Sequence, residues 1–300
     1  MEALRRARGF FSYLREKAGA RGVRRPKIGL ALGGGFARGI AHTGVLAVFQ
    51  RRGVPIHCIT GVSSGSIVAA AFASGTSPDE IARAACSMRF GDVATWSLCR
   101  MGLAASERME RFLERLLKRY RFEAMPTALG VVATDLATGE AVAFRDSGDV
   151  FLPIRASCSY PGLFQPVRAD GRLLVDGAMS MEIPALLARQ LGATHVISVH
   201  LPAQGGDMPP SNVFQVVNRC YQILQTRVEE SWRRDSDLVI TPDVGGVEWN
   251  GFQCAPELIK AGEAAAEASL STIRKWLGET GLRTAVPAGL VVPAAGLPGQ

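Results

Sequence analysis

Leu30-Ala31-Leu32-Gly33-Gly34-Gly35-Phe36-Ala37-Arg38-Gly39 is the stretch of this 300-residue chain that decides its fold. An apolar run breaks into three glycines and reopens with a helical pattern, which predicts a strand, a tight turn and a helix. The backbone N–H groups of such a turn point outward and can bind an anion. We call Gly33 to Phe36 the glycine turn.

A second motif, Gly61-Val62-Ser63-Ser64-Gly65, begins one predicted strand later. The pattern G-x-S-x-G is typical of a strained strand-to-helix elbow that pushes a serine side chain into the open, with Gly61 and Gly65 supporting the bend. An anion site and an exposed serine on consecutive strands predict acyl transfer.

Strand and helix patterns alternate along the chain. Residues 27–32 and 55–60 are typical of buried strands and residues 38–52 of a helix, which together predict a strand-helix-strand unit with parallel pairing. A helix is expected at 64–74. Further strands are expected at 128–134, 140–145, 173–175, 195–201 and 237–240, and further helices at 106–120, 184–191, 213–234 and 255–277. With 47% hydrophobic and 20% charged residues, the chain is expected to form one globular domain.

The net charge of +7 is concentrated at the amino terminus. The first 27 residues hold nine Lys or Arg and two Glu, and the remaining chain has equal numbers of the two signs. Residues 1–26 are therefore expected to form a basic arm with a helical apolar stripe, made of Leu4, Phe11, Leu14 and Ala18. Such an arm fits an anionic membrane surface, and an arm that only packs on the body fits equally. No nucleic-acid partner is expected, because no known motif or basic face is present.

Two observations bear on location. The polar residues Arg15, Glu16 and Lys17 interrupt any apolar core of a secretory signal. The six cysteines form no C-x-x-C pair, which favours a reducing compartment. We therefore expect a cytoplasmic protein that can associate peripherally with the inner face of the membrane. Residues 281–300 are rich in Pro, Gly and Ala and are expected to be a disordered tail. The oligomeric state is left open.

Catalysis by Ser63 needs a base within hydrogen-bond reach, because a serine hydroxyl is a poor nucleophile while it keeps its proton. Asp176 is the leading candidate: it ends a predicted strand before Gly177, and open α/β sheets place their ligand crevices at such strand ends. The glycine turn would then supply the oxyanion hole through Gly33, Gly34 and Gly35. Arg38 could hold the turn or attract an anionic head group.

Other residues and other ligands are alternatives to this catalytic pair and its oxyanion hole. The order Ser63, Asp176, then His195 or His200 matches the triads of α/β-hydrolases, although the dyad is favoured. Asp135 and Asp170 are alternative acids that lack the strand-end position. The glycine turn fits neither nucleotide signature, because Arg38 stands where G-x-G-x-x-G requires its last glycine.

Taken together, these motifs resemble the patatin-like phospholipase family over about residues 27–200. The resemblance is carried by the glycine turn, the serine elbow and Asp176-Gly177-Ala178, with weaker matches at 133–139 and 156–164. It implies a three-layer α/β/α sandwich with a mostly parallel sheet. We place the hydrolase domain at residues 27–280, with the family motifs within 27–200. The resemblance also implies a Ser63–Asp176 dyad and ester hydrolysis without a metal or other cofactor.

One residue departs from the family pattern. Phe36 stands where the family's glycine run often continues. It can still donate its N–H to an oxyanion if the local backbone avoids conformations that only glycine tolerates. The expected function is a serine acyl hydrolase acting on phospholipids or lysophospholipids, and the alternative is a membrane-docked regulatory or adaptor protein with little turnover.

Overall fold

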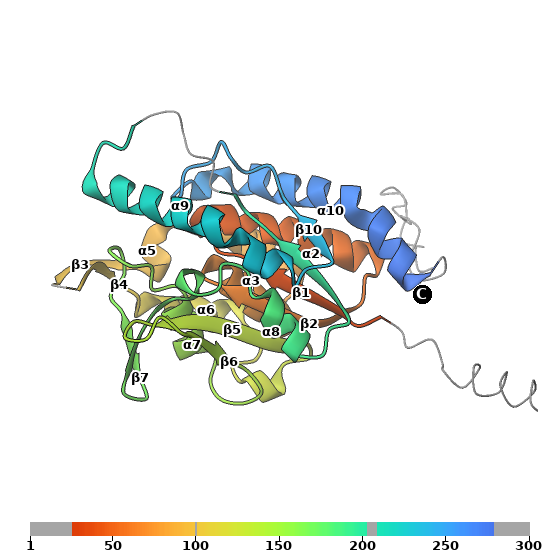
Figure 1. Ribbon diagram of the computed structural model, residues 1–300, viewed down its shortest axis with the longest axis horizontal. Helices are drawn as coiled ribbons and strands as arrows, with labels where there is room; N and C mark the ends of the chain where they lie inside the picture. Colours follow the sequence, from red (N-terminus) through yellow and green to blue (C-terminus); the bar gives the residue numbers. More distant parts are fainter. Residues whose placement is uncertain (1–25, 100, 203–208, 279–300) are drawn as a thin grey trace, which may run out of the picture.

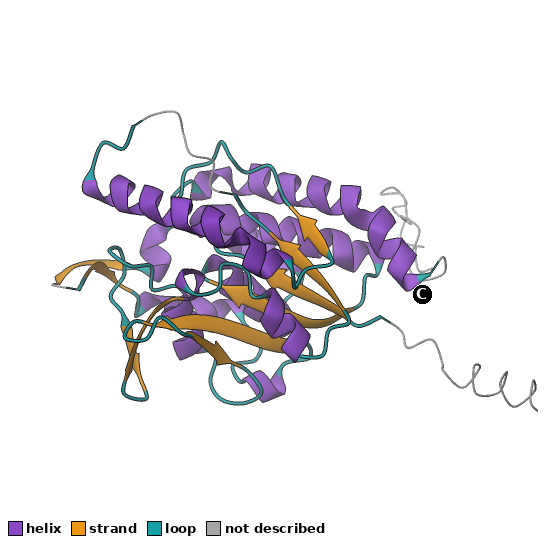
Figure 2. Cartoon of the chain, viewed as in Figure 1, coloured by secondary structure: helices purple, strands orange, loops and turns teal. Residues whose placement is uncertain are grey.

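A mostly parallel sheet runs through the middle of the molecule, with helices against both faces (Figures 1 and 2). The computed structural model describes residues 26–99, 101–202 and 209–278. The predicted basic arm and the predicted tail lie outside this part of the chain. The layered arrangement confirms the expected α/β/α sandwich.

The strands of the main sheet follow the order β10-β9-β1-β2-β5-β8-β7, with β6 pairing to β5. Neighbouring strands from β10 to β5 are parallel, whereas β6 and β8 run antiparallel to β5, and β7 runs antiparallel to β8. The strands are β1 (Ile28–Leu32), β2 (Ile56–Val62), β5 (Ala128–Asp135), β6 (Ala141–Phe144), β7 (Val167–Ala169), β8 (Arg172–Asp176), β9 (His195–Val199) and β10 (Leu238–Ile240).

The register brings the carboxyl ends of the central strands together. Leu32 at the end of β1 is paired with Gly61 of β2 and with Val199 of β9. The loops that leave these strands therefore share one edge of the sheet, where open α/β sheets bind their ligands.

Side chains alternate between the two faces of β1. Leu30 belongs to the large core beneath α2 and α3, whereas Ala31 belongs to a smaller core beneath α8. Small residues on the second face let α8 lie close to the sheet. The helices are α2 (Ala41–Arg52), α3 (Ser64–Ala73), α4 (Pro78–Ser87), α5 (Phe90–Val93), α6 (Arg108–Leu116), α7 (Phe151–Ser157), α8 (Ala185–Gln190), α9 (Val213–Arg233) and α10 (Ala255–Leu277). Short 3₁₀ turns occupy Phe36–Ile40, Phe122–Ala124, Gly177–Met179 and Phe252–Cys254.

Most predicted elements are present, and three differ. The helix expected at 38–52 begins as the 3₁₀ turn at Phe36–Ile40 and becomes α-helical at Ala41. The helix expected at 106–120 is shorter, because α6 ends at Leu116. A hairpin of β3 (Thr95–Cys99) and β4 (Gly102–Ala105) was not expected. It forms a sheet of its own beside the main one (Figure 1).

Candidate active site

Ser63 lies at the junction of β2 and α3, as the G-x-S-x-G pattern predicts. Its backbone has φ 52° and ψ −131°, a conformation that a non-glycine residue adopts only when its surroundings hold it there. The two flanking glycines allow the bend: a Cβ on Gly61 would lie 2.5 Å from the Gly65 carbonyl oxygen, and a Cβ on Gly65 would lie 2.5 Å from that of Leu32. The motif therefore forms a strained elbow.

Hydrogen bonds fix the elbow. The Ser63 N–H donates to the Ser157 hydroxyl at 2.9 Å, and the Ser66 hydroxyl donates to the Ser63 carbonyl at 2.6 Å. Ser157 ends α7 and is fully buried. The serine elbow is thus tied to a helix that lies far away in the sequence.

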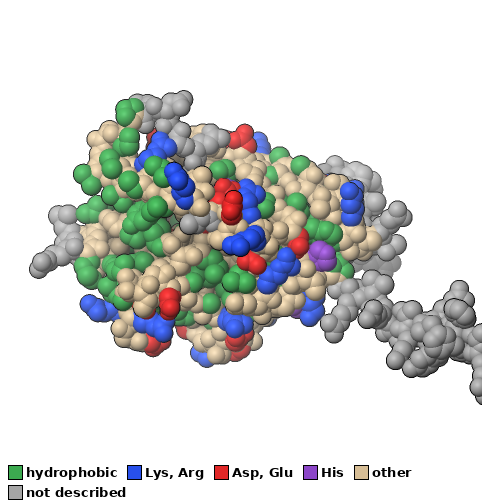
Figure 3. Space-filling view, viewed as in Figure 1, with side chains coloured by type: hydrophobic (Ala, Val, Ile, Leu, Met, Phe, Trp, Pro, Cys, Tyr) green, Lys and Arg blue, Asp and Glu red, His purple; other side chains and the backbone are tan. Residues whose placement is uncertain are grey.

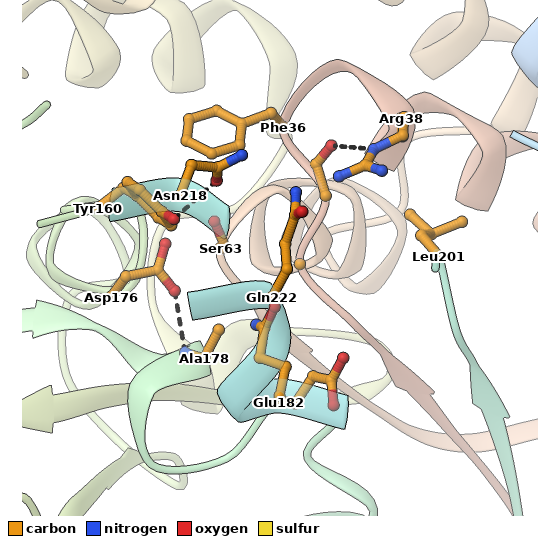
Figure 4. A pocket seen from close by; sticks show the side chains of 13 residues that line it. Phe36, Arg38, Ser63, Tyr160, Asp176, Ala178, Glu182, Leu201, Asn218 and Gln222 are labelled. Atoms are coloured by element: carbon orange, nitrogen blue, oxygen red, sulfur yellow. Dashed lines mark hydrogen bonds between the residues drawn. The ribbon is translucent and has the colours of Figure 1, made fainter. Parts of the chain in front are cut away.

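Asp176 ends β8 and is completely buried. Its Oδ1 accepts a hydrogen bond from the Ala178 N–H at 2.9 Å. Its Oδ2 is buried without a partner of good hydrogen-bond geometry among the described residues. The side chains of Asp176 and Ser63 face the same cavity (Figure 4). A side chain on Gly177 would overlap the Val132 carbonyl, so only glycine can follow the acid here.

Burial controls the chemistry of this carboxyl group. Removal from water raises the pKa of Asp176 to about 7, because the charged form loses its hydration. The hydrogen bond from the Ala178 N–H and the nearby Ser63 hydroxyl act in the opposite direction and favour the carboxylate. At neutral pH the group therefore exchanges its proton readily, as a general base must.

The residues of the glycine turn have different surroundings. The Gly33 N–H donates to the Val199 carbonyl at 3.2 Å, so this N–H is occupied and does not serve the predicted oxyanion hole. Gly34, Gly35 and Phe36 line the cavity with Ser63. The N–H groups of Gly34 and Gly35 have no backbone partner within the described ranges. A Cβ on Gly34 would lie 3.1 Å from the Ser63 Cβ, so only glycine approaches the serine this closely without displacement.

Two side chains, those of His42 and Arg38, hold the glycine turn through hydrogen bonds to its carbonyl oxygens. His42 of α2 is fully buried, and its Nε2 lies 2.8 Å from the Gly33 carbonyl oxygen. Burial lowers the pKa of His42 to about 4, against the raising effect of that hydrogen bond, so the ring is neutral and donates from Nε2. Arg38 donates to the carbonyl oxygens of Gly35 and Pro202 at 3.4 and 3.2 Å, and burial lowers its pKa. The contacts of Arg38 fit the first of its two predicted roles, holding the turn.

Phe36 does not avoid the left-handed region, contrary to the condition derived from its sequence position. Its φ is 52°. Aromatic packing holds this conformation: the ring contacts Tyr160 and Trp249 edge-on, with centroid distances of 4.9 and 5.4 Å. Phe36 therefore holds a backbone conformation that favours glycine, although it is not a glycine.

The cavity beside Ser63 also has polar walls that sequence reasoning missed. Asn218, Gln222 and Gln225 of α9 line it, and the Tyr160 hydroxyl donates to the Asn218 amide oxygen at 2.9 Å. Figure 4 shows Asn218 and Gln222 of α9 among the side chains that surround this cavity. The helical pattern of α9 was visible in the sequence, but which side would face the serine was not.

Neither histidine proposed for a triad lines this cavity. His195 begins β9, opposite Ile28 at the far end of the sheet from Ser63. His200 follows β9, where its Nε2 lies 3.5 Å from a Glu182 carboxylate oxygen and its ring packs on Trp232. The arrangement brings Asp176, not a histidine, to the serine.

The alternative acids also lie elsewhere. Asp135 accepts a hydrogen bond from the Ala137 N–H at 2.9 Å and lies 3.8 Å from Arg172. Asp170 is exposed in the turn between β7 and β8. Neither is among the residues that line the cavity with Ser63.

Comparison with known proteins agrees with this architecture. Residues 30–189, more than half of the chain, match the family model for patatin-like phospholipase. The chain therefore belongs to the patatin-like phospholipase family, which confirms the resemblance found in its motifs.

The relatives differ from this chain in length. An uncharacterized NTE family protein of Mycobacterium tuberculosis is 34% identical over 184 residues, which cover 60% of this chain and 51% of the relative. Patatin-like phospholipase domain-containing protein 6 of Mus musculus is 30% identical over 186 residues, covering 59% and 14%. The chain spans about half the length of the first of these relatives. VipD from Legionella pneumophila has a similar fold, with a TM-score of 0.56 and 14% identity over 83% of this chain and 67% of VipD.

Proposed function

We propose that the protein is a serine acyl hydrolase that cleaves carboxylic ester bonds of phospholipids or lysophospholipids. The observation that carries the proposal is the shared cavity of Ser63 and Asp176, in which a strained serine faces a buried carboxyl group. Beside them lie the N–H groups of Gly34 and Gly35, which have no backbone partner among the described residues. Membership in a family of lipid hydrolases supports the same reaction class.

The first half-reaction is acylation. As Ser63 Oγ attacks the ester carbonyl carbon, its proton passes to Asp176 Oδ2, the oxygen without a good hydrogen-bond partner among the described residues. The carbonyl oxygen becomes an oxyanion, which the N–H groups of Gly34 and Gly35 stabilise. The tetrahedral intermediate then collapses: the carbon–oxygen bond to the alcohol breaks, and Asp176 returns the proton to the leaving oxygen.

The second half-reaction regenerates the enzyme. Asp176 accepts a proton from a water molecule as that water attacks the acyl-serine carbonyl. The same backbone donors stabilise the second oxyanion. On collapse the bond between the acyl carbon and Ser63 Oγ breaks, Asp176 returns its proton to Oγ, and the fatty acid is released. A carboxyl group with a pKa of about 7 can both accept and return the proton near neutral pH.

Lipid-product analysis on a mixed phospholipid and lysophospholipid panel tests the proposal. Ser63→Ala and Asp176→Asn should each abolish fatty-acid release while the variants remain folded. His195→Ala and His200→Ala are the matched controls and should keep most activity, because neither side chain lines the cavity. A histidine variant as inactive as Ser63→Ala would favour a triad.

Labelling with a fluorophosphonate probe separates the enzyme from the adaptor alternative. Wild type should be labelled at Ser63, because attack by the serine forms a stable phosphonyl ester. A folded protein whose Ser63 does not react, and which releases no fatty acid, would favour the membrane-docked adaptor.

We further propose that the basic arm attracts the protein to anionic lipid. The arm lies outside the described residues, so the proposal rests on its charge and apolar spacing. Among the described residues, no helix has the length and apolar character needed to cross a membrane. Deleting residues 1–26 should weaken binding to anionic vesicles, and unchanged binding would remove this role.

A further inference from the structure

Helix α9 exposes an aliphatic face to solvent. The exposed fractions are 80% for Val213, 49% for Val216, 37% for Val217, 53% for Ile223 and 60% for Leu224. Separations of three, four, seven and eleven residues put these side chains on one side of the helix. A helix of a soluble domain ordinarily turns such a stripe toward the core, so this orientation needs a reason.

The opposite side of α9 is attached to the body by polar and aromatic groups. Asn218 accepts the hydrogen bond from Tyr160, and Gln222 lies in the cavity wall beside it. Near the end of the helix, the buried Trp232 donates from Nε1 to Glu182 at 2.9 Å. Helix α9 thus turns its amide groups to the catalytic cavity and its aliphatic groups outward.

The β3–β4 hairpin carries a second group of exposed apolar side chains, with exposed fractions of 65% for Trp96, 47% for Met101 and 43% for Leu103. Figure 3 shows hydrophobic side chains gathered on one flank, over the beginning of α9 and toward this hairpin. We call the exposed residues of the two elements the apolar flank. It consists of Val213, Val216, Val217, Ile223, Leu224, Trp96, Met101 and Leu103.

The distribution of charged residues on α9 fits contact with a lipid surface. The helix contains no acidic residue before Glu229, and its exposed side carries Arg227 one turn beyond Leu224. A long basic side chain at the edge of an aliphatic stripe can place its charge among lipid head groups.

We infer that the apolar flank docks on a phospholipid bilayer, with α9 lying in the interface and its amide side over the cavity. The inference rests on the proposed function, because a lipid ester must pass from the bilayer to Ser63. The same helix forms one wall of the Ser63 cavity and carries most of the flank, so docking places the cavity beside the membrane.

Vesicle sedimentation with full-length protein tests the inference, using phosphatidylcholine vesicles that contain phosphatidylglycerol. Measurements at high salt screen the attraction of the basic arm and leave the apolar contribution. Leu224→Asp should weaken vesicle binding by about tenfold or more, because one aliphatic side chain leaves the interface and a charge enters it. Thr226→Asp adds the same charge at an exposed position off the aliphatic face and should change binding by less than about twofold.

A second variant should strengthen vesicle binding without adding a charge, which separates the apolar contribution from a general effect of charge. Val216→Trp should strengthen vesicle binding at high salt, because an interfacial tryptophan increases the buried apolar area. Thermal melts of all variants should match wild type, since the substituted side chains are exposed.

The two proposals fail in different measurements. Hydrolysis of a short soluble ester depends on Ser63 and Asp176 and does not require membrane docking. Ser63→Ala should lose this hydrolysis and keep vesicle binding. Leu224→Asp should keep soluble-ester hydrolysis and lose hydrolysis of vesicle lipid. If Leu224→Asp binds vesicles like wild type at high salt, docking through α9 is wrong. If it instead converts a dimer to a monomer with binding unchanged, the flank joins two copies and the inference is overturned.

Discussion

Asp176→Asn should stabilise the protein at alkaline pH while it abolishes catalysis. The carboxyl group is completely buried, and burial raises its pKa from 3.8 to about 7. The asparagine oxygen can still accept the hydrogen bond from the Ala178 N–H, so the local geometry persists. What the substitution removes is the free energy needed to ionise a buried acid.

The sign follows from proton linkage. The folded state holds the Asp176 proton up to about pH 7, whereas the unfolded chain releases it near pH 4. The folded state therefore binds more protons in this window, and the free energy of unfolding falls as pH rises. The full effect is about 4 kcal/mol, and the part between about pH 5 and pH 8.5 is about 3 kcal/mol.

Urea or guanidinium unfolding at the two pH values provides the measurement. The advantage of Asp176→Asn over wild type should grow by about 3 kcal/mol from the lower to the higher pH. Asp170→Asn is the matched control, because it makes the same substitution at an exposed carboxylate outside the cavity. If the advantage of Asp176→Asn grows by less than about 1 kcal/mol, the carboxyl group is not held in a strongly desolvated state.

Three further predictions concern the same site. In wild type, kcat/KM for a short soluble ester should rise with pH and reach half its maximum near pH 7, as Asp176 loses its proton; a profile flat from pH 5 to 9 would contradict the base role. Relative to wild type, His42→Gln should gain about 3 kcal/mol in the free energy of unfolding as pH falls from about 6.5 to about 4, because wild type must keep His42 neutral in the folded state. Denaturant unfolding across that range would measure it. Gly34→Ala should lower kcat on the soluble ester by about tenfold or more, because the new methyl group lies 3.1 Å from the Ser63 Cβ. An unchanged kcat would show that the glycine turn shifts to accommodate the methyl group without displacing Ser63.

The sequence predicted the parts of the site that depend on backbone shape. Gly61 and Gly65 mark a bend where a side chain would not fit. Asp176 at the end of β8 lies close to that bend because only one strand, β5, stands between β2 and β8 in the sheet. The sheet order itself was beyond the sequence patterns, since antiparallel pairing of β8 with β5 depends on contacts between distant segments. Local motifs therefore identified the residues, and tertiary pairing brought them together.

The sequence did not predict features that depend on where a side chain lies in the fold, because the same residue type can be buried in one protein and exposed in another. The periodicity of α9 predicted a helix but did not show that its aliphatic side would face solvent, against the usual rule of burial. Likewise, the helical pattern at 38–52 did not show what His42 would contact. Only the fold brings its ring to the Gly33 carbonyl.

His42 and Asp176 have opposite effects on the pH dependence of stability. Burial lowers the pKa of His42 from 6.5 to about 4, so the folded state binds fewer protons there and its stability rises with pH across that interval. Burial raises the pKa of Asp176 from 3.8 to about 7, so stability falls with pH across nearly the same interval. In wild type the two slopes, each about 1.4 kcal/mol per pH unit, nearly cancel between pH 4 and pH 6.5. Each single variant should expose the slope of the other residue: Asp176→Asn should lose stability on acidification, and His42→Gln should lose it as pH rises. The double variant should be flat again, which distinguishes titration of these two groups from a general loosening of the fold.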